Sequence, residues 1–147
     1  MRNLTIFLIF FCVSCGYSPI YKTGDQLNFE FNEIVIEGDE KVKRQIVSTI
    51  DFKKNVSLKK NLLIKTAYKT EETSKNSKGQ VTTYRSIIDA EITVDDGSGN
   101  LMKKNFLNEF SYKNQDNEYV LRKYQDEIRQ NLTQQLVSEI ILFLKLL

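Results

Sequence analysis

The chain has 147 residues, a length that suits one domain and allows a sizeable hydrophobic core. Hydrophobic residues make up 41% and charged residues 27%, a balance typical of a folded globular protein rather than a disordered one. The formal net charge of +2 is too small to indicate nucleic-acid binding, and the absence of histidine excludes catalytic triads built on that residue.

The first 15 residues have the organisation of a lipoprotein leader. Arg2 supplies a short positive region, residues 4–11 are apolar, and small Ser14 precedes Cys15. The apolar stretch is shorter than the roughly 20 residues that a membrane-spanning helix needs, but it suits a signal peptide. The site resembles a bacterial lipobox, at which residues 1–14 are removed and the Cys15 thiol is acylated.

Lipid on Cys15 has two consequences for the mature chain. Cys12 is lost with the leader, so no disulfide partner remains for Cys15. A diacylglycerol together with an amide-linked acyl chain is enough for stable anchoring. Gly16, rather than Asp, follows the cysteine, which by the usual sorting rule indicates the outer membrane, on its periplasmic side. Two alternatives stay open, an ordinary signal peptide that leaves Cys15 as a free thiol and an uncleaved membrane anchor.

Residues 15–28 lack periodicity and contain Pro19 and Gly24, so we expect a lipidated tether before a single domain of residues 29–147. Residues 29–37 are rich in aromatic and β-branched side chains and predict a strand, with a bulge or a later start near Asn32. Asp39 can then cap a helix.

A short amphipathic helix is predicted after Asp39. Val42, Ile46 and Ile50 recur at four-residue spacing. The helix is expected to end near Lys53 and Lys54, where positive charge favours the negative end of the helix dipole.

Three strands follow, and in each of them apolar and polar side chains alternate with a period of two. This alternation covers residues 58–70 and, over the longest distance, residues 81–95. Residues 71–80 between them are polar and predict a turn. Residues 95–100 predict a tight hairpin turn, and a third strand runs to Tyr112. The side chains expected to point inward are Leu58, Leu62, Ile64, Tyr68, Tyr84, Ile88, Ala90, Ile92, Val94, Met102, Phe106, Phe110 and Tyr112.

Residues 118–147 form the longest helical pattern, with apolar residues at steps of three or four. The pattern assigns four polar residues to the solvent side: Asp126, Arg129, Gln130 and Gln134. Residues 140–147 are apolar nearly all round, which allows burial in a partner or fraying. The inward positions are Leu121, Tyr124, Ile128, Leu132, Leu136 and Ile140.

Strands and helices that are apolar on one side favour a common arrangement. The sequence predicts an α+β fold of order β-α-β-β-β-α, with two helices packed on one face of a four-stranded, mostly antiparallel sheet. The opposite face of the sheet is expected to be polar and rich in lysine. That face and the sheet edges are the expected places for a partner or ligand.

The residues that carry enzyme chemistry are not present in a recognisable pattern. The mature chain has no histidine and no cysteine after Cys15, and no phosphate-binding loop occurs. Asp95 and Asp96 lack the spacing of a calcium loop and fit a hairpin turn better. Asp89 and Glu91 could pair as acid and base, but they belong to the outward side of a strand. We expect no catalytic residue, no metal and no cofactor.

Six cations are candidates for an anion-binding strip: Lys59, Lys65, Lys69, Lys75, Lys78 and Arg85. A strip of this kind could contact the phosphates of lipid A. The alternative is an ordinary soluble surface with lysines that protect sheet edges, because Glu71, Glu72 and Glu91 dilute the positive field.

Several segments resemble one family. Residues 15–21, CGYSPIY, are similar to the CGFRPLY opening of alphaproteobacterial lipopolysaccharide-assembly lipoproteins, the LptE family. The strand and helix at residues 34–45 resemble the next segment of that family. Residues 111–140, from Ser111-Tyr112 through the long helix, are similar to its C-terminal region.

The resemblance implies a two-helix, four-stranded sandwich anchored by lipid in the outer membrane. It also implies a function, as a plug and assembly partner of the LptD β-barrel that assists lipopolysaccharide insertion in the outer leaflet. The implied partners are that barrel, lipopolysaccharide and the membrane, with no nucleic acid. The alternative is a periplasm-facing lipoprotein that binds a small ligand or pilots another secretion complex.

Overall fold

The structure, a computed structural model, describes residues 28–147, so the expected leader, most of the expected tether and Cys15 lie outside the described residues. The elements follow in the order β1 (Asn28–Phe31), β2 (Glu33–Gly38), α2 (Glu40–Thr49), β3 (Asp51–Lys54), β4 (Asn61–Lys75), β5 (Val81–Asp95), β6 (Leu101–Lys113) and α3 (Glu118–Lys145).

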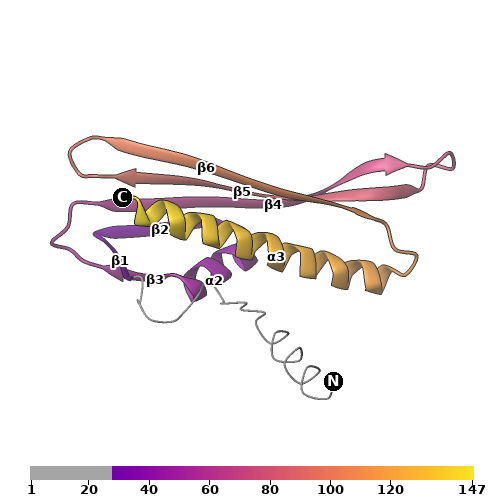
Figure 1. The fold of residues 1–147 in the computed structure, drawn as a ribbon, viewed down its shortest axis with the longest axis horizontal. Coiled ribbons are helices and arrows are strands. Elements are labelled where there is room, and N and C mark those ends of the chain that lie inside the picture. Colours follow the sequence, from indigo (N-terminus) through magenta and orange to yellow (C-terminus); the bar gives the residue numbers. More distant parts are fainter. Residues whose placement is uncertain (1–27) are drawn as a thin grey trace, which may run out of the picture.

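A four-stranded sheet in the order β2-β4-β5-β6 forms one layer of the domain. β2 runs parallel to β4, whereas the β4–β5 and β5–β6 hairpins are antiparallel. Both helices lie on one face of this sheet, and α3 runs along its length (Figure 1). The predicted fold class and element order are confirmed, with a small parallel sheet of β1 and β3 added to them.

The predicted irregularity near Asn32 is confirmed, because the chain breaks there into β1 and β2. β1 pairs with β3, and β2 enters the main sheet beside β4. Asn32 holds the break, since its backbone N–H donates to the carbonyl of Lys60 at 2.8 Å and its side-chain amide donates to Asn61 at 2.9 Å. The break explains why Phe31 is buried although its parity differs from that of Ile34 and Ile36.

Helix α2 begins as predicted and ends earlier than predicted. The Asp39 carboxylate accepts hydrogen bonds from the backbone N–H groups of Lys41 and Val42, each at 3.0 Å. The helix stops at Thr49, and Ile50 is already extended. The predicted end at residues 53–54 is wrong because those residues form β3, whose Phe52 packs against Phe29 at 6.5 Å between ring centroids.

Strand β4 starts and ends later than predicted. Leu58 was expected to point inward from this strand, but it lies before β4 and is exposed. Residues 71–75, which were predicted as part of a turn, continue the strand because they pair with β5 through two register shifts. The turn itself covers residues 76–80, where the Asn76 side-chain oxygen accepts from the backbone N–H groups of Lys78 and Gln80.

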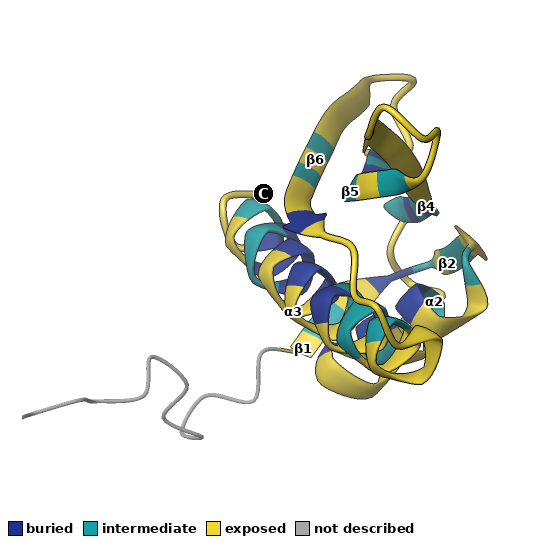
Figure 2. Cartoon of the chain, turned by 90° about the vertical axis from the view of Figure 1, so that its right-hand side faces the viewer, coloured by how far each residue is buried: buried dark blue, intermediate teal, exposed yellow. Residues whose placement is uncertain are grey.

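The core lies between the sheet and the two helices. Buried residues occupy the sides of α3 and of the strands that face each other (Figure 2). The apolar C-terminal segment packs into this core through Ile140, Ile141 and Leu144, so it is part of the domain and remains helical to Lys145. Within residues 28–147, no helix combines the length and the apolarity that crossing a membrane requires.

Candidate functional site

The sheet face that points away from the helices carries charges of both signs. Lys65 of β4 lies in register between Glu37 of β2 and Glu91 of β5. Ile87 is buried on this same face, next to Lys69 across the β4–β5 pairing. The β4–β5 part of the face is polar, as the sequence predicts, but acids and bases alternate across its strands, and β6 exposes Leu101 and Leu107 on the same face.

The structure spreads the six candidate cations along the sheet. Lys59 precedes β4, Lys78 lies in the turn after it, and a strand of 15 residues is about 50 Å long. The others follow between these ends, with Lys65 and Lys69 on β4, Lys75 at its last position and Arg85 on β5. The six residues therefore line one hairpin and do not converge on a single point.

Three of the six cations form ion pairs. Their charged atoms approach carboxylate oxygens at 2.7 Å for Lys69 and Glu71, 3.0 Å for Lys75 and Glu72, and 3.5 Å for Arg85 and Glu109. The hydrogen bond from Lys69 lowers the pKa of Glu71, and the same contact raises the pKa of Lys69. These pairs neutralise the middle and outer parts of the strip.

Lys59, Lys65 and Lys78 take no part in the ion pairs found within residues 28–147, and all three are exposed. Lys78 lies at the tip of the β4–β5 hairpin, where residues 71–80 are exposed throughout. This tip projects past the start of α3 (Figure 1). Lys78 is therefore exposed there to an anionic ligand.

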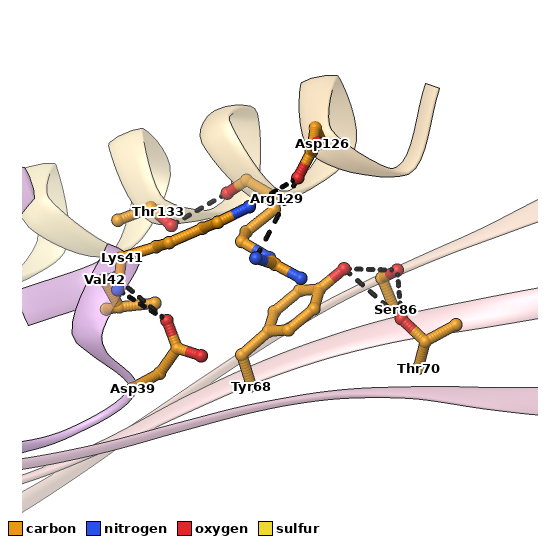
Figure 3. A network of polar contacts seen from close by, with 9 residues as sticks. All are labelled: Asp39, Lys41, Val42, Tyr68, Thr70, Ser86, Asp126, Arg129 and Thr133. Carbon is orange, nitrogen blue, oxygen red and sulfur yellow. Dashed lines mark hydrogen bonds and ion pairs between the residues drawn. The ribbon is translucent and has the colours of Figure 1, made fainter. Parts of the chain in front are cut away.

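A cluster of hydroxyl groups lies inside the domain, under the first turns of α3 (Figure 3). The Ser86 hydroxyl is fully buried and lies 2.9 Å from the Tyr68 hydroxyl, 3.2 Å from that of Thr70 and 3.2 Å from that of Tyr112. Tyr112 in turn packs edge-on against Tyr124 of α3. The cluster joins three strands and one helix through partners that are mutually satisfied.

Arg129 lies over this cluster, with its guanidinium carbon 4.2 Å from the centre of the Tyr68 ring (Figure 3). Its assignment to the solvent side of α3 is wrong, because the side chain is only 24% exposed and points at the sheet. Arg129 lies seven residues, or about two helical turns, before the buried Leu136, so the two residues are on the same side of α3. This spacing was the signal in the sequence that Arg129 faces the sheet. A cation over an aromatic face is a stabilising arrangement and here closes the end of the apolar core.

An ion pair ties the two helices together beside Arg129. The ammonium group of Lys41 on α2 lies 2.9 Å from the carboxylate of Asp126 on α3, and Arg129 lies 3.9 Å from the same oxygen. The hydrogen bond from Lys41 lowers the pKa of Asp126 below its ordinary value. Sequence reasoning did not connect these residues, because they are 85 positions apart.

Two recesses lie on the surface of the described chain. The first, of about 220 Å³, separates β6 from α3 and is lined by Phe110, Tyr124, Glu127, Ile128, Asn131, Leu132 and Gln135. The second, of about 270 Å³, lies at the end of α2 along residues 47–52. Both are smaller than the roughly 300–1,000 Å³ of typical small-molecule sites.

Of the acidic residues considered for chemistry, Asp89 and Glu91 are half-buried on the outer face of β5, and the turn residues have structural partners. The Asp96 carboxylate accepts from the backbone N–H of Ser98 at 2.7 Å and from the side chain of Asn100 at 2.9 Å, which confirms the hairpin turn. Hydrogen bonds from Asn100 and then Ser98 lower the pKa of Asp96. Within residues 28–147, no three potential metal-ligating side chains gather in one place.

These features define a class, a small two-helix sandwich with a polar sheet face and a projecting cationic hairpin. Solved structures with a similar fold include bacterial lipoproteins. Rare lipoprotein B from Shewanella oneidensis superposes with a TM-score of 0.61 and 10% identity, covering 78% of this chain and 94% of that one. Lipoprotein B from Nitrosomonas europaea superposes with a TM-score of 0.58 and 10% identity, covering 84% of this chain and 88% of that one.

A minor lipoprotein from Acinetobacter baumannii gives a TM-score of 0.50 with 11% identity, covering 77% of this chain and 90% of that one. At such identities the likeness concerns the fold. No family model matches the sequence, and no curated protein matches it either. The chain therefore has the fold of known bacterial lipoproteins over nearly their whole length.

Proposed function

We propose that the protein is a lipid-anchored component of the lipopolysaccharide translocon at the outer membrane, where it serves as plug and assembly partner of an LptD-like β-barrel and assists lipopolysaccharide insertion. One observation carries the proposal. A lipobox-like leader that ends at Cys15 and a CGYSPIY opening precede a sandwich whose fold also occurs in rare lipoprotein B.

The surface of the domain supports a role inside a polar enclosure. Large outer-membrane barrels have polar interiors. The outer sheet face carries paired charges, as in Lys69 with Glu71 and Arg85 with Glu109, and such a face is suited to contact with polar walls and water. A surface with strong charge of one sign would fit such a lumen less well.

Lipopolysaccharide contact is proposed at the six cations along the β4–β5 hairpin. Lys59, Lys65 and Lys78 are the strongest candidates because no acidic partner engages them in an ion pair within residues 28–147. Phosphate groups bind cations of this kind through charge-assisted hydrogen bonds. Lys78 lies at the exposed hairpin tip, away from the core.

The alternative of a free lipoprotein that binds a small ligand has less support. The two recesses described above hold about 220 Å³ and 270 Å³, and both are open. A drug-sized ligand is usually buried over most of its surface in a larger cavity. The space between sheet and helices is filled by the core residues.

The proposal is tested by isolating the full-length protein from its native membrane in mild detergent and identifying bound proteins by mass spectrometry. We expect one large outer-membrane barrel at a level close to equimolar. The matched control carries residues 1–28 fused to an unrelated soluble domain, because it shares the anchor and lacks the sandwich. A barrel retained equally by the control, or normal barrel assembly after depletion of the protein, would contradict the proposal.

A further inference from the structure

Within residues 28–147, strand β6 is a long free edge of the main sheet. It has 13 residues, and its pairing with β5 runs from Leu101 to Lys113 without a register shift. The opposite edge, β2, has only six residues. A long, regular edge presents a row of backbone N–H and C=O groups that another strand can pair with, and natural sheets usually interrupt such edges with bulges or proline. β6 contains neither.

The same edge exposes large apolar side chains on both faces of the sheet. Leu101 and Leu107 are exposed on the outer face, at 60% and 65%. Met102 and Phe110 are exposed on the helix face, at 52% and 47%. Four exposed apolar residues on one edge strand are a large amount of unpartnered apolar surface for a protein of this size.

We propose that β6 pairs with β6 of a second copy of this chain, antiparallel, about a two-fold axis that passes through Phe106. In this register Lys103 faces Glu109 of the partner subunit, and Glu109 faces Lys103 of the partner subunit. Both residues lie on the outer sheet face, because they share the odd parity of Leu101 and Leu107. Opposite charges directly across two strands stabilise the pairing.

The register also matches apolar residues on the helix face. Met102 faces Phe110 of the partner subunit, and a thioether beside an aromatic ring is a favourable contact. Moving the axis by one residue, to Asn105 or to Leu107, removes the Lys103–Glu109 pairs and sets these charged residues opposite apolar or neutral side chains. The sequence of β6 is therefore self-complementary in one register.

Glu109 can serve two cations. Arg85 of the same chain lies 3.5 Å from one carboxylate oxygen, and both side chains are 40% exposed or more. A carboxylate has two oxygens with several lone pairs, so it accepts from a second cation without losing the first. Lys103 lies across from Thr93 on β5, a neutral neighbour.

Helix α3 supplies a second, independent argument. Leu142 is 62% exposed although it lies in the last, otherwise apolar part of this helix. It lies two turns beyond Gln135, whose side chain reaches Asn108 of β6 at 3.4 Å, so Leu142 is on the side of α3 that faces the free edge. The next residue, Phe143, packs edge-on against Phe106 at 6.1 Å. Leu142 is thus close to the proposed axis.

A sheet continued through two β6 strands brings the two α3 helices together. Strands in a sheet are about 4.8 Å apart, and α3 packs beneath β5 and β6. The two helix axes are then about 10 Å apart, which is the usual distance for packed helices. Leu142 of each copy meets Leu142 of the partner subunit there, so the dimer covers the exposed surfaces of strand and helix together.

An alternative role for Lys103 and Lys104 is to prevent edge strands from associating, as lysines on sheet edges commonly do. The two roles make opposite predictions for Lys103→Glu. An edge-protecting lysine can be replaced by glutamate without effect on association, because either charge repels its own kind. In the proposed dimer the same change sets glutamate against Glu109 of the partner subunit at two places.

The test counts chains in the purified lipidated protein by native mass spectrometry, which strips the detergent micelle before the mass is measured. We expect the wild type to be dimeric at micromolar concentration. Lys103→Glu and Glu109→Lys should each weaken dimerisation at least about tenfold, since each sets like charges against each other twice. Lys123→Glu makes the same charge change at an exposed site on α3 and should leave the dimer intact.

Mixing the two charge-reversed variants gives the most specific result. In the mixed dimer both cross-axis pairs are again of opposite sign, so dimers of one variant with the other should form within about threefold of the wild-type affinity. A monomeric wild type, a Lys103→Glu variant that dimerises normally, or a mixture that stays monomeric would each overturn the proposal. The proposed dimer is the form of the lipidated protein outside a barrel, and the test does not depend on the proposed function, because it uses no barrel and no lipopolysaccharide.

Discussion

Ser86 bonds to three other hydroxyl groups in a site from which solvent is excluded. Ser86→Ala removes their common partner and leaves the buried Tyr112 hydroxyl without it, which costs about 1–3 kcal/mol of unfolding free energy. Urea unfolding followed by circular dichroism measures this loss. Ser111→Ala, at an exposed position on the outer face of β6, is the control and should change stability by less than about 0.5 kcal/mol. Equal losses of unfolding free energy at the two sites would mean that the hydroxyl cluster does not stabilise the domain.

Asp126 gives the domain a pH-dependent contact between its helices. Its pKa is lower in the folded than in the unfolded chain because Lys41 donates to the carboxylate. The stabilisation is therefore complete above the unfolded pKa and is lost as the pH falls through the lower, folded pKa. Since both side chains are more than half exposed, Asp126→Asn should cost only about 0.5 kcal/mol at neutral pH.

The measurement compares wild type and Asp126→Asn by urea unfolding at two pH values. The difference should be full at about pH 7 and smaller at about pH 3, because the ion pair is lost as the pH falls through the lowered pKa of the folded state. Glu118→Gln removes a carboxylate from an exposed pair within α3 and serves as the control for general charge effects. A difference that persists at low pH would show that the ion pair is not its cause.

The alternation along β5 predicted which side chains are buried, because a half-buried strand has a period of two and Ile88, Ala90 and Ile92 obey it. Arg129 was misassigned because charge was given more weight than helical position. The ion pair of Arg85 with Glu109 could not be predicted, since it depends on the register between β5 and β6. The pair of Lys69 with Glu71 lies within β4, where the alternation puts both side chains on one face.

At the level of elements, Gly38 joins β2 to α2 where two backbones approach closely. Its φ is +113°, and a Cβ atom there would lie 1.8 Å from the carbonyl oxygen of Thr66. Gly38→Ala must displace β4 or the start of the helix, so we expect a loss of at least about 3 kcal/mol. Gly79 also has positive φ, at +78°, but nothing lies within 4 Å of the added atom. Gly79→Ala should cost only about 1–2 kcal/mol.

Thermal unfolding of the two glycine variants separates crowding from backbone strain. Both changes introduce the same atom at a left-handed residue, and only Gly38 has a neighbour in the way. Similar losses for the two variants would contradict the close contact between Gly38 and Thr66.

Element boundaries were the least predictable part of the fold. The end of α2 depends on β3, which forms only because residues 51–54 pair with β1, and no local signal in the sequence marks that pairing. Residues 71–75 are polar like a turn, yet they extend β4 because β5 offers a partner strand. In both cases a long-range pairing overrode local composition.

In the molecule as a whole, one side of the sheet is buried by the helices and the other is exposed. The helix side is filled by the core and fixes the shape of the domain. The outer side and the hairpin tip carry exposed charge, and the β6 edge carries exposed apolar residues. The proposed contacts with a partner or ligand lie on the outer face and the edge, and they require that the domain be held near that partner.

The expected lipid anchor at Cys15 would meet that requirement and therefore concerns the whole molecule. Cys15→Ser removes the only thiol that the mature chain is expected to keep, so lipid labelling should be abolished and the protein released from the membrane fraction. Radiolabelled palmitate and membrane fractionation measure the two effects. Cys12→Ser changes the neighbouring cysteine, which is expected to be removed with the leader, and should leave labelling and retention unchanged. Labelling and retention of the Cys15→Ser protein at wild-type levels would contradict acylation at this residue.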